Sequence, residues 1–141
     1  MRKGFPSLAL PLFAAAASLA FIPYAAAQSA ALDGKAFVAD AGLKGKDAHE
    51  KGDVISFNGG MFHSSACDQY GYGKAAYKAT PSGDAVQFEA ETKSEKDGRL
   101  VWKGTVRGGE IEGTFVRYGK GWLLNPNPDP QEHWFKGKVK S

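Results

Sequence analysis

The sequence of 141 residues has one cysteine, three histidines and no long apolar run after its N-terminal region. A single cysteine cannot form a disulfide within the chain, which excludes a disulfide-stapled scaffold, and it also excludes a zinc finger built on several cysteines. No later stretch approaches the roughly 20 apolar residues that a membrane-spanning helix needs. The sequence also lacks an excess of charge of one sign, since 18 Lys and Arg stand against 15 Asp and Glu.

The first 27 residues have the three-part pattern of a secretory signal peptide. A positive start at residues 2–3 is followed by an uncharged apolar stretch over residues 8–22, and the small residues Ala25 and Ala27 precede Gln28. Prolines within the stretch argue against an uncleaved membrane anchor. We therefore expect cleavage after Ala27, no membrane insertion of the mature chain, and a periplasmic or secreted protein.

Cleavage would leave residues 28–141 as a single domain. Its net charge would be +1, because the removed segment carries two basic residues and no acidic residue. A nucleic-acid-binding protein needs a basic patch or stripe, whereas lysine and glutamate are interleaved here. The sequence therefore predicts no nucleic-acid partner.

The mature segment alternates between apolar and polar residues, which is typical of strands with one buried face. The clearest hairpin joins residues 100–107 to residues 111–116 through Gly108-Gly109, a turn suited to positive φ. Further strands are expected at residues 32–39, 54–57, 61–67, 77–79, 86–92 and 133–140. About eight short strands predict an all-β fold, a single antiparallel up-and-down β-barrel, with a β-sandwich as the alternative. We favour the barrel because closure removes exposed strand edges.

Two long connections interrupt this regular pattern. The segment Gly42–Gly52 is rich in lysine, glycine and aspartate, and its residues 47–50 could form one helical turn. The segment Gly119–Gln131 carries the apolar residues 122–124 and then three prolines. Three roles are open for residues 122–124: a plug at one end of the core, which we favour, a lid over the barrel mouth, or an exposed contact patch.

A second unusual stretch contains His63 and Cys67. If residues 61–67 are extended, His63 and Cys67 point to the same face, where both could bind a metal or a haem iron. The other histidines, His49 and His133, lie in different segments, and nothing in the sequence places them together. Cys67 could also be a reactive thiol or link two chains in a disulfide, but a lone cysteine is more often a small buried residue. The sequence predicts no resident cofactor, with metal or haem as the weaker alternative.

Aromatic residues offer the better indication of a function. Some fall on the inward positions of predicted strands, including Trp102 and Phe115, whereas others flank glycines in connections. Aromatic side chains at the mouth and interior of a barrel suit the recognition of an apolar or planar ligand. The candidate ligand-binding residues are Tyr70, Tyr72, Tyr118, Trp122, Trp102 and Phe115.

Several short segments together resemble a group of short exported bacterial proteins of unassigned function. They are Leu32-Asp-Gly-Lys, Phe62-His-Ser-Ser-Ala-Cys67, Tyr70-Gly-Tyr-Gly, Phe88-Glu-Ala-Glu-Thr92 and Trp102-Lys-Gly-Thr-Val106. At the level of fold, the chain resembles the small lipocalin-like (calycin-type) barrels that hold apolar ligands. It differs from them at Ala36, where the lipocalin opening strand carries the tryptophan of Gly-x-Trp.

These patterns lead to three functional hypotheses. The first is a non-enzymatic, exported β-barrel that binds an apolar or planar small molecule, with the Gly119–Gln131 loop over the mouth. The second is a protein-binding module, such as a secreted hydrolase inhibitor, that presents Tyr70, Tyr72 and Trp122. The third is a thiol, metal or haem site at His63 and Cys67. The protein is expected to be a monomer or a dimer linked through Cys67.

Overall fold

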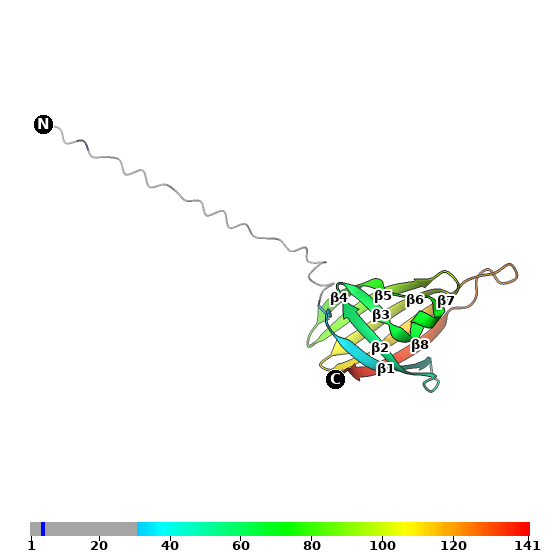
Figure 1. The fold of residues 1–141 in the computed structure, drawn as a ribbon, viewed down its shortest axis with the longest axis horizontal. Helices are drawn as coiled ribbons and strands as arrows, with labels where there is room; N and C mark the ends of the chain where they lie inside the picture. Colours follow the sequence, from blue (N-terminus) through cyan, green and yellow to red (C-terminus); the bar gives the residue numbers. More distant parts are fainter. Residues whose placement is uncertain (1–3, 5–30) are drawn as a thin grey trace.

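The computed structural model describes residue 4 and residues 31–141, so the predicted signal peptide lies outside the described residues except for Gly4. The described chain forms one closed antiparallel barrel in which the strands follow one another in chain order (Figure 1). This confirms the predicted all-β up-and-down barrel and excludes the β-sandwich. The eight strands are β1 (Ala36–Leu43), β2 (Glu50–Asn58), β3 (Met61–Ser64), β4 (Ala75–Ser82), β5 (Ala85–Ser94), β6 (Gly98–Arg107), β7 (Glu110–Gly119) and β8 (Gln131–Val139).

The barrel closes where β8 pairs with β1, with Phe37 opposite Val139 and Leu43 opposite His133. The predicted hairpin at Gly108-Gly109 is confirmed, since β6 and β7 pair along their whole length and Gly108 has a φ of 58°. Alternation decides which side chains face inward: in β5 the buried residues recur at every second position from Phe88 to Ser94.

Three local predictions are wrong. The first strand begins at Ala36 and not at Leu32, because residues 31–34 form a turn that tucks Leu32 into the core. The third strand ends at Ser64, where the chain turns into the 3-10 helix η1 (Ser65–Tyr70). Residues 47–50 do not form a helical turn, and β2 already begins at Glu50. In the described residues, no helix has the length and apolar character to cross a membrane.

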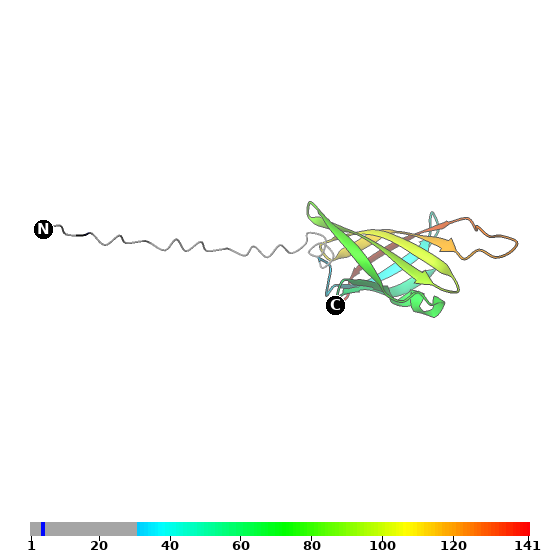
Figure 2. The ribbon, with the colours of Figure 1, turned by 90° about the horizontal axis from the view of Figure 1, so that it is seen from above.

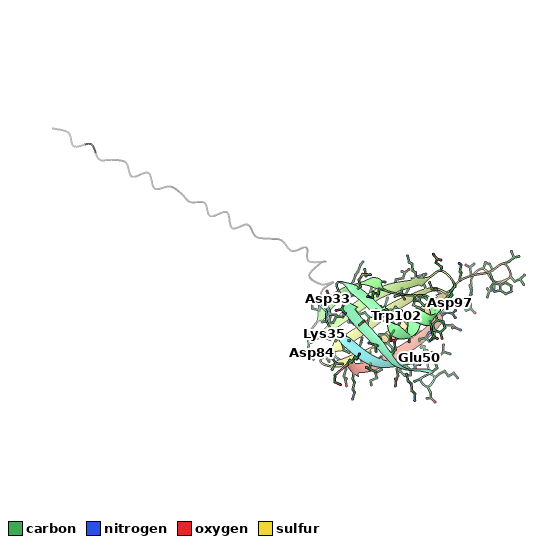
Figure 3. All side chains as sticks on the ribbon, viewed as in Figure 1. Asp33, Lys35, Glu50, Asp84, Asp97 and Trp102 are labelled. Atoms are coloured by element: carbon green, nitrogen blue, oxygen red, sulfur yellow. The ribbon has the colours of Figure 1, made fainter. Side chains whose placement is uncertain are left out.

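One end of the barrel is closed by the segment before β1. The Tyr77 hydroxyl donates to Asp33 Oδ1 at 2.7 Å and accepts from the Leu32 amide at 3.2 Å. The Asp33 carboxylate also accepts from the amide of Gly60, in the β2–β3 turn. Figure 3 labels Asp33, Lys35 and Asp84 at this end, Glu50 and Asp97 at the other, and Trp102 between them.

Aromatic rings fill the barrel behind this closed end. Phe57 makes edge-to-face contacts with four neighbouring rings, those of Phe37, Phe62, Tyr77 and Phe88. Such pairs add to the burial energy of each ring. The rings fit because Gly104 of β6 lies opposite Gly113 of β7, which leaves the interior wall without side chains next to Phe88 and Phe135.

The opposite end carries η1 and the long connections. The segment between β7 and β8 extends away from the barrel along its axis (Figures 1 and 2). Trp122 is 60% exposed, Leu123 94% and Leu124 79%. The favoured plug and the lid are therefore both wrong, and residues 122–124 form an exposed apolar patch. The turn made by Trp122 and Asn125, which bond to each other through both amides, keeps these side chains outside.

Candidate functional site: a cavity at the open end of the barrel

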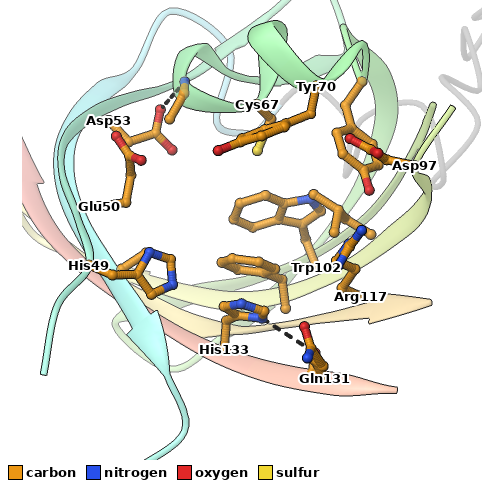
Figure 4. A pocket seen from close by; sticks show the side chains of 15 residues that line it. His49, Glu50, Asp53, Cys67, Tyr70, Asp97, Trp102, Arg117, Gln131 and His133 are labelled. Carbon is orange, nitrogen blue, oxygen red and sulfur yellow. Dashed lines mark hydrogen bonds between the residues drawn. The ribbon is translucent and has the colours of Figure 1, made fainter. Parts of the chain in front are cut away.

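A cavity of about 330 Å³ opens at the end of the barrel that carries η1 (Figure 4). Its walls come from β1, β2, β6, β7 and β8, and η1 lies over one side. Four of the six predicted ligand-binding residues line it: Tyr70, Tyr72, Trp102 and Phe115. The strand alternation that directs Trp102 and Phe115 inward therefore places them at the inner wall of the cavity.

A row of four rings forms one wall of the cavity. Trp102 stacks on Phe115 at 4.3 Å between ring centroids, and Phe115 stacks on His133 at 4.5 Å with the rings 5° from parallel. His133 then meets the edge of His49 at 5.6 Å. We call these four side chains the aromatic row. Nothing in the sequence indicates that His49 lies near His133. The fold brings them together because β8 pairs with β1 and the His49 amide donates to the Ala41 carbonyl of β1.

Two hydrogen bonds orient the aromatic row. Trp102 Nε1 donates to the Thr92 hydroxyl at 3.2 Å, which fixes the indole from the neighbouring strand β5. His133 Nδ1 lies 3.3 Å from the backbone carbonyl of Gln131, which assigns the ring proton to Nδ1. Burial lowers the pKa of His133, and the nearby His49 and Arg117 lower it further, against the opposing effect of that hydrogen bond. The imidazole is therefore neutral at pH 7 and behaves as a flat, mostly apolar ring.

The cavity wall also contains a buried hydroxyl whose proton has no acceptor in the protein. Tyr72 is 5% exposed, and its hydroxyl is the one buried side-chain polar atom of the described residues that makes no hydrogen bond. Burial raises the pKa of Tyr72, whereas the Arg117 guanidinium lowers it, as a donor directed to the hydroxyl oxygen and through its charge. An arginine cannot accept, so the hydroxyl proton still has no acceptor. An unpaired buried hydroxyl costs about 1–3 kcal/mol. The barrel therefore holds a donor at the cavity wall that the protein itself does not satisfy.

Tyr72→Phe is expected to leave the free energy of unfolding unchanged or to raise it by up to about 1 kcal/mol, because it removes an unpaired hydroxyl. Tyr77→Phe is the matched control: it removes the two hydrogen bonds to Asp33 and Leu32 and should cost about 1–3 kcal/mol. Urea denaturation of both variants measures the difference. Equal losses of stability would show that the Tyr72 hydroxyl is satisfied in the protein.

A buried carboxylate fastens η1 to the barrel. Asp53 of β2 is 6% exposed and accepts from the Ser64 hydroxyl at 2.6 Å, the Ser65 hydroxyl at 3.0 Å and the Ala66 amide at 2.9 Å. These bonds satisfy the first turn of η1 from outside the helix, as a capping side chain does. Because η1 carries Cys67 and Tyr70, Asp53 determines where the roof of the cavity lies.

The structure separates His63 from Cys67. His63 alternates with the buried residues Phe62 and Ser64, so it faces outward, where its Nε2 bonds to Asp68 at 2.7 Å. Cys67 lies in η1 and lines the cavity. The prediction that His63 and Cys67 share one face required an extended chain up to residue 67. The chain instead leaves β3 at Ser64 and enters η1, so the two side chains do not share a face. In the described residues, no group of three or more His, Cys, Asp or Glu is arranged to hold a metal ion.

The Cys67 thiol is held in its protonated form. Burial raises the pKa of Cys67 to about 11, and the carboxylates of Asp53, Asp68 and Glu50 act in the same direction, whereas the contact with Ser64 opposes them. The Ser64 hydroxyl lies 3.3 Å from the Cys67 sulfur, but its shorter hydrogen bond, at 2.6 Å, goes to the Asp53 carboxylate. A protonated thiol is a poor nucleophile and a poor metal ligand.

Alkylation of Cys67 by iodoacetamide at pH 7.5 is expected to be about a hundredfold slower than that of an unperturbed thiol, since a rise of two pH units in pKa lowers the thiolate fraction that much. The rate should rise about tenfold per pH unit up to about pH 10. Intact-mass spectrometry against glutathione in the same tube follows both reactions. A rate at pH 7.5 that matches glutathione would contradict the buried, protonated thiol.

The two other predicted ligand-binding residues lie away from the cavity. Tyr118 is on the outer face of β7, where the Arg99 guanidinium lies 4.0 Å from the centre of its ring. Trp122 belongs to the exposed patch. The prediction for both residues rested on the glycines next to them. Tyr118 instead lies within β7, an odd number of positions from the inward-facing Phe115, and alternation therefore directs it outward.

Sequence reasoning did not place the charged and histidine residues of the cavity wall, among them Arg117, His133, His49 and Asp53. Arg117 lies two positions after the inward-facing Phe115 in β7, and His133 lies two positions before the inward-facing Phe135 in β8. Extending the alternation by one step would therefore have found both. Asp53 likewise continues the inward alternation of Ile55 and Phe57 in β2. No such signal marks His49, whose place depends on the path of the β1–β2 connection. Comparison of the chain with protein-family models, characterised proteins and solved structures found no match.

Proposed function

We propose that this protein is a non-enzymatic binding protein that holds a small planar, largely apolar molecule in the open end of its barrel. The observation that carries the proposal is the aromatic row along the cavity wall. A volume of about 330 Å³ lies in the range of small-molecule pockets, which are lined mainly by apolar and aromatic side chains with a few polar groups. Because Phe115 already stacks with Trp102 and His133, a flat ring system can pack against this wall through edge-to-face and apolar contacts.

In this function the barrel works as a lipocalin-like container: side chains close one end, and the ligand enters at the other. The proposal also includes export to the periplasm or the medium, which rests on the signal-peptide pattern of residues 1–27. The position of Cys67 in the cavity wall supports a monomer over a disulfide-linked dimer, because the thiol does not lie on the outer surface.

The states of Cys67 and Asp53 make these two cavity groups unsuited to act as a nucleophile or a general base. The Cys67 thiol is protonated, and the Asp53 carboxylate is occupied by three hydrogen bonds within the protein. A general base or a nucleophile needs a free lone pair at the reacting atom. Neither group offers one to a molecule in the cavity.

A second candidate function is binding to another protein, and the exposed patch at residues 122–124 favours it. Exposed apolar patches on small proteins often mark contact surfaces. Tyr70 is 48% exposed at the same end of the barrel, whereas Tyr72 is buried and is not available to a partner. In this role, such as inhibition of a secreted hydrolase, residues 122–124 would insert into the partner and the cavity would stay empty.

Native mass spectrometry of the protein isolated from the organism that makes it tests the proposal. The expected spectrum shows a small-molecule adduct on the native protein that is lost on denaturation. Ala41→Trp, which places an indole in the cavity from β1, should remove the adduct, while Trp122→Ser with Leu123→Ser and Leu124→Ser should keep it. If the spectrum instead shows a complex with another protein, and only the triple serine variant loses it, the second candidate is favoured and the first is contradicted.

A further inference from the structure

We propose that the ligand is a planar aromatic acid with a single negative charge, whose anionic group meets Tyr72 and Arg117 while its rings lie along the aromatic row. This inference rests on the proposed function and names the chemical class of the ligand. It depends on the polar side of the cavity, which the aromatic row alone does not explain.

The first observation is the Tyr72 hydroxyl. It belongs to a side chain that is 5% exposed and lines the cavity, and it has no hydrogen-bond partner in the described residues. Buried hydroxyls in folded proteins are nearly always paired. A ligand oxygen at this point would accept the hydrogen bond that the barrel leaves unmade.

The second observation is the charge of Arg117. Its guanidinium lies beside Tyr72 and lines the same cavity, and no carboxylate of the described residues forms an ion pair with it. Guanidinium groups bind carboxylates through parallel hydrogen bonds, which adds a strong directional contact. The Tyr72 hydroxyl and the Arg117 guanidinium can therefore both donate hydrogen bonds to one anionic group.

The acidic residues of the cavity limit the charge of the ligand. Figure 4 shows Glu50 and Asp53 on the side away from Arg117. Asp97 also lines the cavity, near enough to Tyr72 for its charge to raise the pKa of that hydroxyl. A second negative charge would meet one of these carboxylates, since the cavity is too small to separate them widely. A monoanion with its charge at Arg117 keeps that charge away from Glu50 and Asp53, and the guanidinium offsets the charge of Asp97. Its uncharged rings extend towards His133 and His49.

Isothermal titration calorimetry with 2-naphthoate and 2-naphthamide tests the inference, because the two compounds have the same rings and nearly the same shape. The wild-type protein is expected to bind 2-naphthoate about tenfold more tightly, which corresponds to about 1.4 kcal/mol. Arg117→Gln should reduce the preference for 2-naphthoate to less than twofold. Tyr72→Phe should lower the affinity for both compounds. Arg107→Gln is the matched control, because Arg107 pairs with Asp84 near the closed end and should change neither affinity.

Each outcome separates the inference from the proposed function. Equal affinities for the two compounds in the wild-type protein, or a preference that persists in Arg117→Gln, would overturn the aromatic acid while leaving a cavity that binds planar molecules. Binding of neither compound would contradict the proposed function itself, since both compounds carry the planar rings that the aromatic row is proposed to bind. Circular dichroism of each variant confirms that the barrel is intact.

Discussion

Asp53→Ala is expected to lower the free energy of unfolding by about 3 kcal/mol and to release η1 from the barrel. The carboxylate holds the first turn of η1 through three hydrogen bonds, and hydrogen bonds to a charged group contribute about 1.5–3 kcal/mol each. Alanine leaves the buried Ser64 hydroxyl and the Ala66 amide without their partner. Hydrogen exchange at residues 65–70 should accelerate, because η1 has no fully buried residue and only Cys67 packs partly against the core.

Asp68→Asn provides the control for this experiment. Asp68 is an exposed residue of η1 whose partner is His63, so its replacement should cost less than about 1 kcal/mol, as surface ion pairs do. Urea denaturation gives both values. If Asp53→Ala and Asp68→Asn have the same stability as the wild type, Asp53 does not fasten the roof of the cavity.

Gly113→Ala is expected to cost about 3 kcal/mol, at the upper end of the range for overpacked interiors. The methyl group would lie 2.6 Å from the Gly104 Cα atom, 2.8 Å from the Phe135 ring and still closer to the Lys103 carbonyl oxygen. Two of these three contacts are with backbone atoms, which cannot turn aside as a flexible side chain does. The β6–β7 pairing and the Phe135 ring must both shift to admit the methyl group.

Gly119→Ala is the matched control, since it lies in the same strand and has open space around it. Its added methyl group would meet only Pro128, at 3.7 Å, which is an ordinary contact distance. The change should therefore stay within about 0.5 kcal/mol of the wild type. Thermal unfolding of the two variants compares them directly. A loss for Gly113→Ala no larger than that for Gly119→Ala would mean that the glycine pair is not needed for packing of the interior rings.

The sequence was informative where a local pattern decides the structure. Alternation in β5, β6 and β7 directs Phe88, Trp102 and Phe115 inward, and the turn at Gly108-Gly109 joins two of these strands. A strand with one buried face has this pattern whatever the rest of the chain does. Consecutive hairpins of this kind lead to an up-and-down barrel, so the fold followed from the sequence.

The cavity depended on contacts between distant segments, which no local pattern reveals. Ser64 and Ser65 look like a continuation of β3, but Asp53 from the preceding strand captures them and turns the chain into η1. The same turn separates His63 from Cys67 and removes the predicted ligand pair. His49 and His133 are 84 positions apart, and only closure of the barrel between β1 and β8 places their rings in contact.

The measurement that tests the central claim most directly is a nuclear magnetic resonance titration with planar aromatic fragments, read at the indole N–H signals of the three tryptophans. Trp102 lines the cavity, whereas Trp122 lies in the exposed patch and the Trp134 indole bonds to the Lys46 carbonyl outside it. Binding in the cavity should shift the Trp102 signal alone, and Ala41→Trp should abolish the shift. Fragments that leave Trp102 unchanged, or that shift it equally in Ala41→Trp, would contradict a ligand site in the barrel.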